Sequence, residues 1–153
     1  MSRVVVLDSG VLGLVTNPKP AVEALRCARW LDTILAAGMA VVVPEIADYE
    51  MRRELLRAGR VNGIRRLNAL TSHLFYLPIT TDMMLQAAEF WAQARRQGRP
   101  TAAKDALDGD AILAAQTAVF SAATGQAAVI ATTNVGHLSR FVAAEIWGAI
   151  MPD

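Results

Sequence analysis

The sequence has little that would place the protein outside the cell or in a membrane. It contains one cysteine, Cys27, in 153 residues, so no disulfide can form within the chain and a reducing compartment is expected. The first apolar run, at 4–7, is too short for a signal peptide, and no later run approaches the ~20 residues of a membrane span. We therefore expect a cytoplasmic protein with no membrane partner, in which Cys27 is a buried structural thiol.

The sequence also has no large excess of positive or negative charge. Fifteen Lys and Arg residues against fourteen Asp and Glu leave a net charge of +1, so any contact with nucleic acid must come from a local patch. Internal repeats, low-complexity tracts and a second-domain boundary are absent from the sequence. With 54% hydrophobic residues, the chain predicts a single domain over 1–153 that buries roughly two-thirds of its unfolded surface.

Short apolar runs bounded by Gly, Pro or polar residues predict strands that are buried on both faces. These runs lie at 4–7, 39–43, 75–77 and 127–131, and a last short strand is expected at 145–148. Helical spacing of apolar residues predicts helices at 20–37, 46–58, 62–72, 81–97 and 108–123. The alternation predicts an α/β fold, a three-layer α/β/α sandwich with a central parallel sheet of four to five strands.

Local signals predict where two of the helices begin. Thr81 is a candidate N-cap of the helix at 81–97, and Asp108 is a candidate N-cap of the helix at 108–123. The intervening stretch at 98–107 is expected to be a long loop, and a long loop beside acidic residues suits the rim of an active site.

Three carboxylates are placed where the chemistry of such folds takes place. Asp8 directly follows the first strand, Glu50 lies in the helix after the second, and Asp110 lies at the start of the last predicted helix. Ligands of open α/β sheets bind outside the carboxyl ends of the strands, so convergence of the three would define a site. Asp48 and Glu50 point about 200° apart on a helix and cannot share a site, whereas Glu45 is explained by the helix dipole.

The exit of the fourth strand is polar. Thr132, Thr133 and Asn134 lie at the same sheet edge, where they either orient water or a ligand oxygen or serve as ordinary turn residues. His137 has no second histidine nearby and is expected to be a turn or surface residue.

Basic side chains border the acidic positions. They would either hold RNA phosphates or form solvated helix faces. The candidates for RNA binding are Arg52, Arg53, Arg99 and Lys104.

Four motifs in register resemble the PIN domain family, and within it the small VapC-type ribonucleases that act as toxins of toxin–antitoxin pairs. The motifs are Val-Val-Leu-Asp8-Ser, Tyr49-Glu50-Met51-Arg52-Arg53-Glu54-Leu55 after Pro44, Asp110-Ala-Ile-Leu-Ala-Ala, and Ala131-Thr132-Thr133-Asn134 followed by His137 and Phe141. Their order and spacing cover almost the whole chain. The resemblance implies a PIN-like fold whose first three acidic positions are Asp8, Glu50 and Asp110.

The fourth family position departs from the common pattern. Many members have an aspartate there, whereas this chain has Asn134, which removes one negative charge. Asp108 either supplies the missing charge or acts as a cap. The set Asp8, Glu50 and Asp110 is a hard, oxygen-only set that selects Mg²⁺ or Mn²⁺, and the absence of paired His or Cys argues against zinc.

The resemblance implies a metal-dependent endoribonuclease acting on single-stranded or structured RNA, an antitoxin partner that docks over the groove, and a homodimer. The main alternative is a PIN-like module that binds RNA or protein without cutting, which Asn134 makes conceivable. A phosphotransferase or receiver-type phosphoacceptor is disfavoured. The sequence lacks a second aspartate two residues after Asp8 and a Gly-rich phosphate loop.

Overall fold

One parallel sheet of five strands forms the centre of the computed structural model, which describes residues 3–19, 21–97 and 104–153 and, over 104–106, the backbone alone. The strands are β1 (Val4–Leu7), β2 (Val41–Pro44), β3 (Phe75–Leu77), β4 (Ala128–Thr132) and β5 (Ala144–Ile146). Their order in the sheet is β3-β2-β1-β4-β5, and every neighbouring pair is parallel. The predicted α/β class with a parallel sheet is confirmed.

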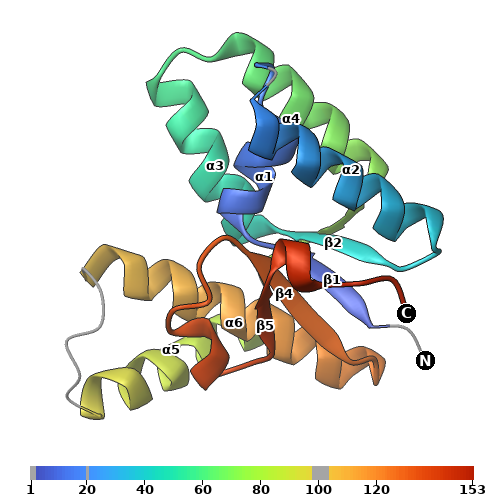
Figure 1. Cartoon of the computed structure of the whole chain (residues 1–153). Coiled ribbons are helices and arrows are strands. Elements are labelled where there is room, and N and C mark those ends of the chain that lie inside the picture. Colours follow the sequence, from blue (N-terminus) through green and yellow to red (C-terminus); the bar gives the residue numbers. More distant parts are fainter. Residues whose placement is uncertain (1–2, 20, 98–103) are drawn as a thin grey trace.

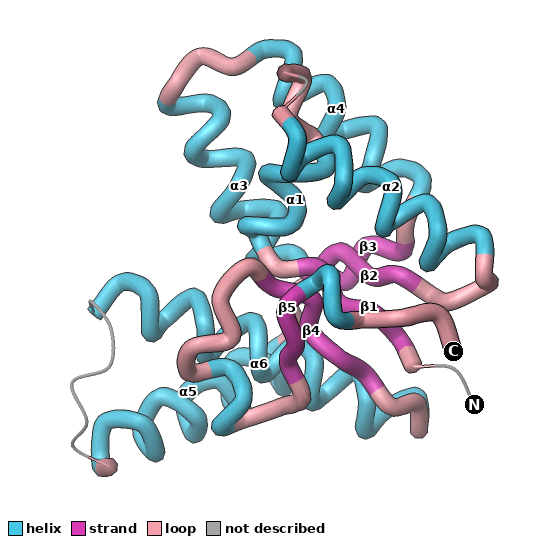
Figure 2. Tube along the Cα trace, in the orientation of Figure 1, coloured by secondary structure: helices cyan, strands magenta, loops and turns pink. Residues whose placement is uncertain are grey.

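Helices cover both faces of this sheet. They are α1 (Ser9–Val15), α2 (Val22–Ala36), α3 (Glu45–Arg57), α4 (Val61–His73), α5 (Thr81–Arg96) and α6 (Lys104–Thr124), with 3₁₀ turns at Leu138–Arg140 and Trp147–Ala149. Figure 1 shows α1 to α4 on one side of the sheet and α5 and α6 on the other. The same three layers are visible in the trace of Figure 2. None of the helices, over the described residues, is long and apolar enough to cross a membrane.

The central strand explains why the sequence of β1 is continuously apolar. Val5 and Leu7 pack into the cluster formed with α1, α2 and α4, whereas Val4 and Val6 pack into the cluster on the side of α5 and α6. Successive side chains of a strand point to opposite faces, so a strand covered on both sides needs apolar residues at every position. Cys27 belongs to the first cluster and is fully buried, and burial raises the pKa of its thiol to about 12.

The structure corrects several helix boundaries. Helix α1 was not predicted, because it spans seven residues, two of them glycine, and shows too short a periodic pattern. Thr80, not Thr81, caps α5 by accepting a hydrogen bond from the backbone N–H of Met83. Helix α6 begins at Lys104, so the predicted loop is wrong over 104–107, and its remainder at 98–103 lies outside the described residues.

The early start of α6 also overturns the capping role of Asp108. This residue lies inside the helix and is exposed, so it cannot serve as the N-cap. The last strand, predicted at 145–148, is found at Ala144–Ile146, and its expected last two residues belong to the 3₁₀ turn Trp147–Ala149.

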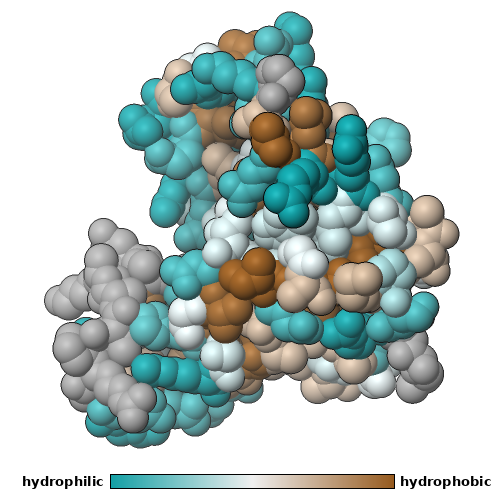
Figure 3. All heavy atoms as spheres, viewed as in Figure 1, coloured by the Kyte–Doolittle hydropathy of each residue, from teal (hydrophilic) through white to brown (hydrophobic). Residues whose placement is uncertain are grey.

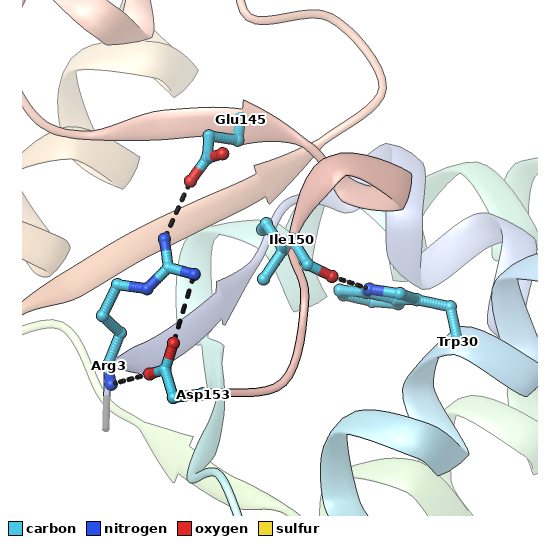
Figure 4. A network of polar contacts seen from close by, with 5 residues as sticks. All are labelled: Arg3, Trp30, Glu145, Ile150 and Asp153. Atoms are coloured by element: carbon cyan, nitrogen blue, oxygen red, sulfur yellow. Dashed lines mark hydrogen bonds and ion pairs between the residues drawn. The ribbon is translucent and has the colours of Figure 1, made fainter. Parts of the chain in front are cut away.

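Both ends of the described chain are tied together. The backbone N–H of Arg3 donates to Asp153 at 2.7 Å, its guanidinium contacts Glu145 at 2.9 Å, and the Trp30 indole donates to the Ile150 carbonyl at 2.9 Å (Figure 4). These contacts hold the C-terminal segment against β5, β1 and α2. In the view of Figure 3, hydrophilic side chains cover much of the outer surface of the helices above the sheet, and apolar residues form smaller patches.

A partly buried ion pair within α3 also contacts α4. Asp48 is 7% exposed and accepts two hydrogen bonds from Arg52, at 3.1 and 3.0 Å. The same guanidinium donates to Asn68 of α4 at 2.7 Å. Asp48 therefore has a structural role, as its separation from Glu50 around the helix predicts.

We predict that Arg52→Met lowers the free energy of unfolding by roughly 1–3 kcal/mol, because it leaves the Asp48 carboxylate buried without its partner. Urea denaturation measures this loss. Arg57→Met is the matched control, since Arg57 pairs with Glu54 on the exposed face of the same helix and should leave stability unchanged. Equal losses in the two variants would contradict a structural role for Arg52.

Candidate active site

The sheet order places a crevice at the end of β1. The chain adds β2 and β3 on one side of β1 and then returns to add β4 and β5 on the other. Leu7 and Ala131 are paired across β1 and β4, so the residues that follow them, Asp8 and Thr132, lie side by side. The point where strand order reverses is where open α/β sheets bind ligands.

Asp8 is held rigidly at this point. One carboxylate oxygen accepts a hydrogen bond from the backbone N–H of Ser9 at 2.6 Å, which makes Asp8 the N-cap of α1. The other accepts from the hydroxyl of Thr132 at 2.7 Å. Thr132 is fully buried, and its hydroxyl also accepts from the backbone N–H of Asn134 at 3.1 Å. Asp8 therefore keeps a fixed orientation without a cationic partner in these contacts.

Glu50 reaches the site from α3. Its carboxylate packs against Gly109 of α6 so closely that a Cβ at that position would overlap Glu50 Oε2. Burial, followed by the negative charges of Asp8 and Asp110, raises the pKa of Glu50, while Arg53 opposes the shift. Gly109 thus leaves room for the Glu50 carboxylate in the position it occupies, and a side chain there would displace that carboxylate.

Asp110 reaches the site from α6. Burial raises its pKa from 3.8 to about 6, the charge of Asp8 adds to the shift, and His137 opposes it. His137 lies in the turn before the 3₁₀ segment, as expected, is half-buried, and is near enough to influence the pKa of Asp110.

The three carboxylates converge. Asp8 raises the pKa of both Glu50 and Asp110, which requires all three charges to lie within electrostatic range of one another. Among the described residues, no group of three His, Cys, Asp or Glu side chains is arranged closely enough to hold a metal ion. The chemistry of the donors nevertheless fits a hard divalent cation, because oxygen atoms and uncompensated negative charge are what Mg²⁺ and Mn²⁺ require.

The other polar residues of the β4 exit lie at the rim. Thr133 and Asn134 are exposed. Gly10 allows Thr133 to approach α1, since a Cβ on Gly10 would come within 2.7 Å of the Thr133 hydroxyl oxygen. The catalytic roles of these residues, and of the three carboxylates, stay predictions.

A hollow of about 340 Å³ opens beside Glu50, between α3 and α6. Its lining residues are Ile46, Tyr49, Glu50, Arg53, Asp108, Gly109 and Ile112. The Arg53 guanidinium lies 5.1 Å from the centre of the Tyr49 ring, and both side chains are exposed. The hollow therefore joins a cation and an aromatic ring to the acidic centre.

The remaining candidates for RNA binding differ in their surroundings. Arg52 is engaged by Asp48 and Asn68, which favours the structural interpretation of that residue. Lys104 begins α6, but its side chain lies outside the described residues, as does all of Arg99.

Sequence reasoning missed Gly109 and Gln116. Gly109 leaves room for the Glu50 carboxylate, and its flanking aspartates instead suggested the start of a helix. Gln116 is fully buried and hydrogen-bonded to other elements. The available sign was a polar side chain at 116, beside Thr117, in the otherwise apolar run 111–120.

Comparison with solved structures shows what this arrangement is similar to. The chain matches VapBC2 from Rickettsia felis bound to a promoter DNA fragment, with a TM-score of 0.70 and 14% identity over 93% of this chain and 97% of that one. It matches VapBC-1 from nontypeable Haemophilus influenzae, with a TM-score of 0.62 and 19% identity over 95% and 98% of the two chains. It also matches VapC20 from Mycobacterium tuberculosis, a sarcin-ricin loop cleaving toxin, with a TM-score of 0.55 and 16% identity over 90% and 96%.

No protein-family model and no curated protein matches the sequence. The structural matches extend over nearly the whole chain and show that it has the PIN-domain fold of VapC-type proteins. At these identities the likeness concerns the fold.

The raised pKa of Asp110 predicts how stability depends on pH in the absence of divalent cations. Because the folded chain binds this proton more tightly than the unfolded chain, stability is greatest below about pH 4 as far as this group is concerned, and it falls as the pH rises through about 6. Asp110→Asn should therefore raise the free energy of unfolding by about 1–2 kcal/mol at pH 7.5 and give almost no gain at pH 4.

Thermal or urea unfolding in chelator at both pH values checks this expectation. Asp32→Asn is the control, because Asp32 is exposed on α2 and should give no gain at either pH. A gain for Asp110→Asn that is independent of pH would contradict the electrostatic cause.

Proposed function

We propose that this chain is a metal-dependent endoribonuclease that hydrolyses RNA phosphodiester bonds, and that it is the toxin of a toxin–antitoxin pair. The observation that carries the proposal is the convergence of Asp8, Glu50 and Asp110 at the point where strand order reverses. The fold shared with VapC20, described as a sarcin-ricin loop cleaving toxin, supports the same activity class.

Asp8, Glu50 and Asp110 would hold Mg²⁺ or Mn²⁺. Such an ion supplies positive charge that activates water and stabilises the negative charge developing on a phosphodiester during in-line attack. Desolvation and mutual repulsion of the carboxylates make cation binding favourable, because the bound charge relieves both penalties.

The polar residues of the β4 exit have separate tasks in this proposal. Thr132 donates to Asp8 and so keeps the second carboxylate oxygen in one orientation. Thr133 and Asn134 are exposed at the edge of the crevice and can donate to or accept from water or a phosphate oxygen there. Asn134 contributes no charge, so the site carries three carboxylates, with Asp108 available at the wall of the neighbouring hollow.

Among the described side chains, Arg53 is the cation best placed to bind substrate. It lines the hollow beside Glu50, and its charge acts on that carboxylate. A phosphate next to the scissile bond would contact its guanidinium, and a neighbouring base would find an aromatic surface in Tyr49, which is 55% exposed.

An antitoxin protein is the partner proposed on the same basis. The Rickettsia felis and Haemophilus influenzae matches are VapBC structures. A second hollow of about 380 Å³, mostly apolar, lies between α5 and α6 and shares Asp108 and Ile112 with the first, so a docked antitoxin segment could reach from one to the other. The homodimer implied by the resemblance stays a prediction.

Asp8→Asn and Asp110→Asn should each reduce Mn²⁺- or Mg²⁺-dependent cleavage of RNA by roughly a hundredfold or more, since each removes one charged oxygen donor from the ion. Cleavage of total RNA by the purified chain, with and without chelator, measures this effect. Asp32→Asn, an exposed acid on α2, should cleave like the wild type.

Full activity in either site variant, or in chelator, would contradict a metal-dependent nuclease centred on these carboxylates. Binding of RNA without any cleavage by the wild-type chain would favour the alternative of a PIN-like binding module.

Arg53→Gln should weaken the binding of single-stranded RNA about three- to tenfold and reduce the slope of log K against log salt by about 0.7, the loss of one phosphate contact. The measurement is made in an Asp8→Asn background, which keeps the RNA intact. Arg57→Gln is the matched control one turn along α3, because its guanidinium is paired with Glu54 away from the hollow. Equal effects in the two variants would indicate general attraction by helix charge, without a specific contact.

A further inference from the structure

Gln116 joins three elements of the fold from inside α6. The side chain is fully buried, its oxygen accepts a hydrogen bond from the backbone N–H of Ile46 at 3.1 Å, and its nitrogen donates to the carbonyl of Leu77 at 2.8 Å. Ile46 lies in the first turn of α3, and Leu77 ends β3. One amide therefore connects α6 to the helix that carries Glu50 and to the edge of the sheet.

The hydrogen bond with Gln116 satisfies a backbone N–H in the first turn of α3, that of Ile46. The first N–H groups of a helix have no partner within the helix, and the N-cap of α3 is Pro44, which offers no side-chain hydrogen bond. The Glu45 side chain accepts from the backbone N–H of Ile79 instead. The start of α3 is therefore located by two contacts with other elements, of which Gln116 is the one that comes from α6.

Glu50 and Gly109 form the other end of the same helix contact. Glu50 follows Ile46 by one turn of α3, and Gly109 precedes Gln116 by two turns of α6, so each pair lies on one helix face. Ile46 meets Gln116, and Glu50 meets Gly109. The two helices thus run in opposite directions along this contact, with a hydrogen bond at one end and a close approach at the other.

Asp110 follows Gly109 in α6, so a change in the spacing of the α3–α6 contact would also change the separation between Glu50 and Asp110. We propose that Gln116 is a positioning residue of the active site: by fixing the start of α3 to α6, it sets the position of Glu50 relative to Asp110. This inference rests on the proposed nuclease function of the acidic centre. Gln116 itself does not touch substrate or ion.

The test compares Gln116→Leu with Thr117→Val. Both variants remove a buried polar group from neighbouring positions of α6, but Thr117 donates only within its own helix, to the Leu113 carbonyl at 2.9 Å. A loss that follows from removing a buried side-chain polar group of α6 as such should appear in both. A loss that follows from the position of Glu50 should appear in Gln116→Leu alone.

Three readouts are taken on the full chain. Amide hydrogen exchange reports whether Ile46 has lost its acceptor. Electron paramagnetic resonance of free Mn²⁺ reports ion affinity without any turnover. Steady-state RNA cleavage at saturating Mn²⁺ separates kcat from KM. Where Gln116→Leu does not fold, Gln116→Met carries the test, because its flexible side chain fills the volume without reproducing the two hydrogen bonds.

For the Gln116 variant we expect faster exchange at Ile46, Mn²⁺ affinity weakened about tenfold or more, and kcat reduced by a similar factor with KM for RNA within about twofold. Thr117→Val should match the wild type in all three. Gln116 variants that bind Mn²⁺ and cleave like Thr117→Val, or that fail to fold with either replacement, would overturn the positioning role. A wild-type chain that neither binds Mn²⁺ nor cleaves RNA would instead overturn the nuclease proposal itself.

Discussion

The hydrogen bond between Thr132 and Asp8 depends on the feature that organises the whole site, the parallel pairing of β1 with β4. The two residues are 124 positions apart in the chain, and the pairing of Leu7 with Ala131 brings them to one sheet edge. All the helices from α1 to α6 lie between these strands in the sequence, so the crevice exists only once the return from β3 to β4 is complete. The buried hydroxyl then fixes one oxygen of Asp8.

The acidic centre is electrostatically unfavourable in the chain alone. Burial is the largest cause of the raised pKa of both Glu50 and Asp110, and Asp8 adds repulsion to each. The helix dipole gives Asp110 little compensation, because α6 begins at Lys104 and the favourable field of a helix N-terminus falls off within the first turn. Arg53 and His137 oppose the shifts in part. The fold therefore concentrates negative charge that is only partly compensated at this edge of the sheet.

Much of this arrangement could be predicted from the sequence. The continuous apolar character of β1, β2 and β4 indicated strands covered on both faces, and the acids at or after their ends indicated the edge where a site would lie. The opposite directions of Asp48 and Glu50 around α3 followed from helical geometry alone, and the structure pairs Asp48 with Arg52 accordingly. These inferences succeeded because each depends on local periodicity and on one general rule of sheet topology.

The errors came from information that is not local. The Asp-Gly-Asp segment looks like the start of a helix, because aspartate is a good cap and glycine a poor helix former. In the folded chain, Gly109 lies inside α6, where its lack of a side chain leaves room for the carboxylate of Glu50 from another helix. Gln116 is similar, since its partners are backbone groups of Ile46 and Leu77. Helix–helix contacts of this kind determine where α6 can lie, and no single segment records them.

Asn134 occupies the position at which many members of the PIN domain family have an aspartate. An aspartate in place of Asn134 would add a fourth negative charge beside groups whose charged forms are already penalised by burial and by Asp8. Asn134 keeps an oxygen that can accept a hydrogen bond while it removes that repulsion, and its backbone N–H still bonds to the Thr132 hydroxyl that orients Asp8. Compared with an aspartate, Asn134 thus lowers the electrostatic cost of the acidic centre and, in the proposed nuclease, also lowers its attraction for a cation. The balance between these two effects depends on how closely Glu50 and Asp110 are held, which is the distance that the α3–α6 contact controls.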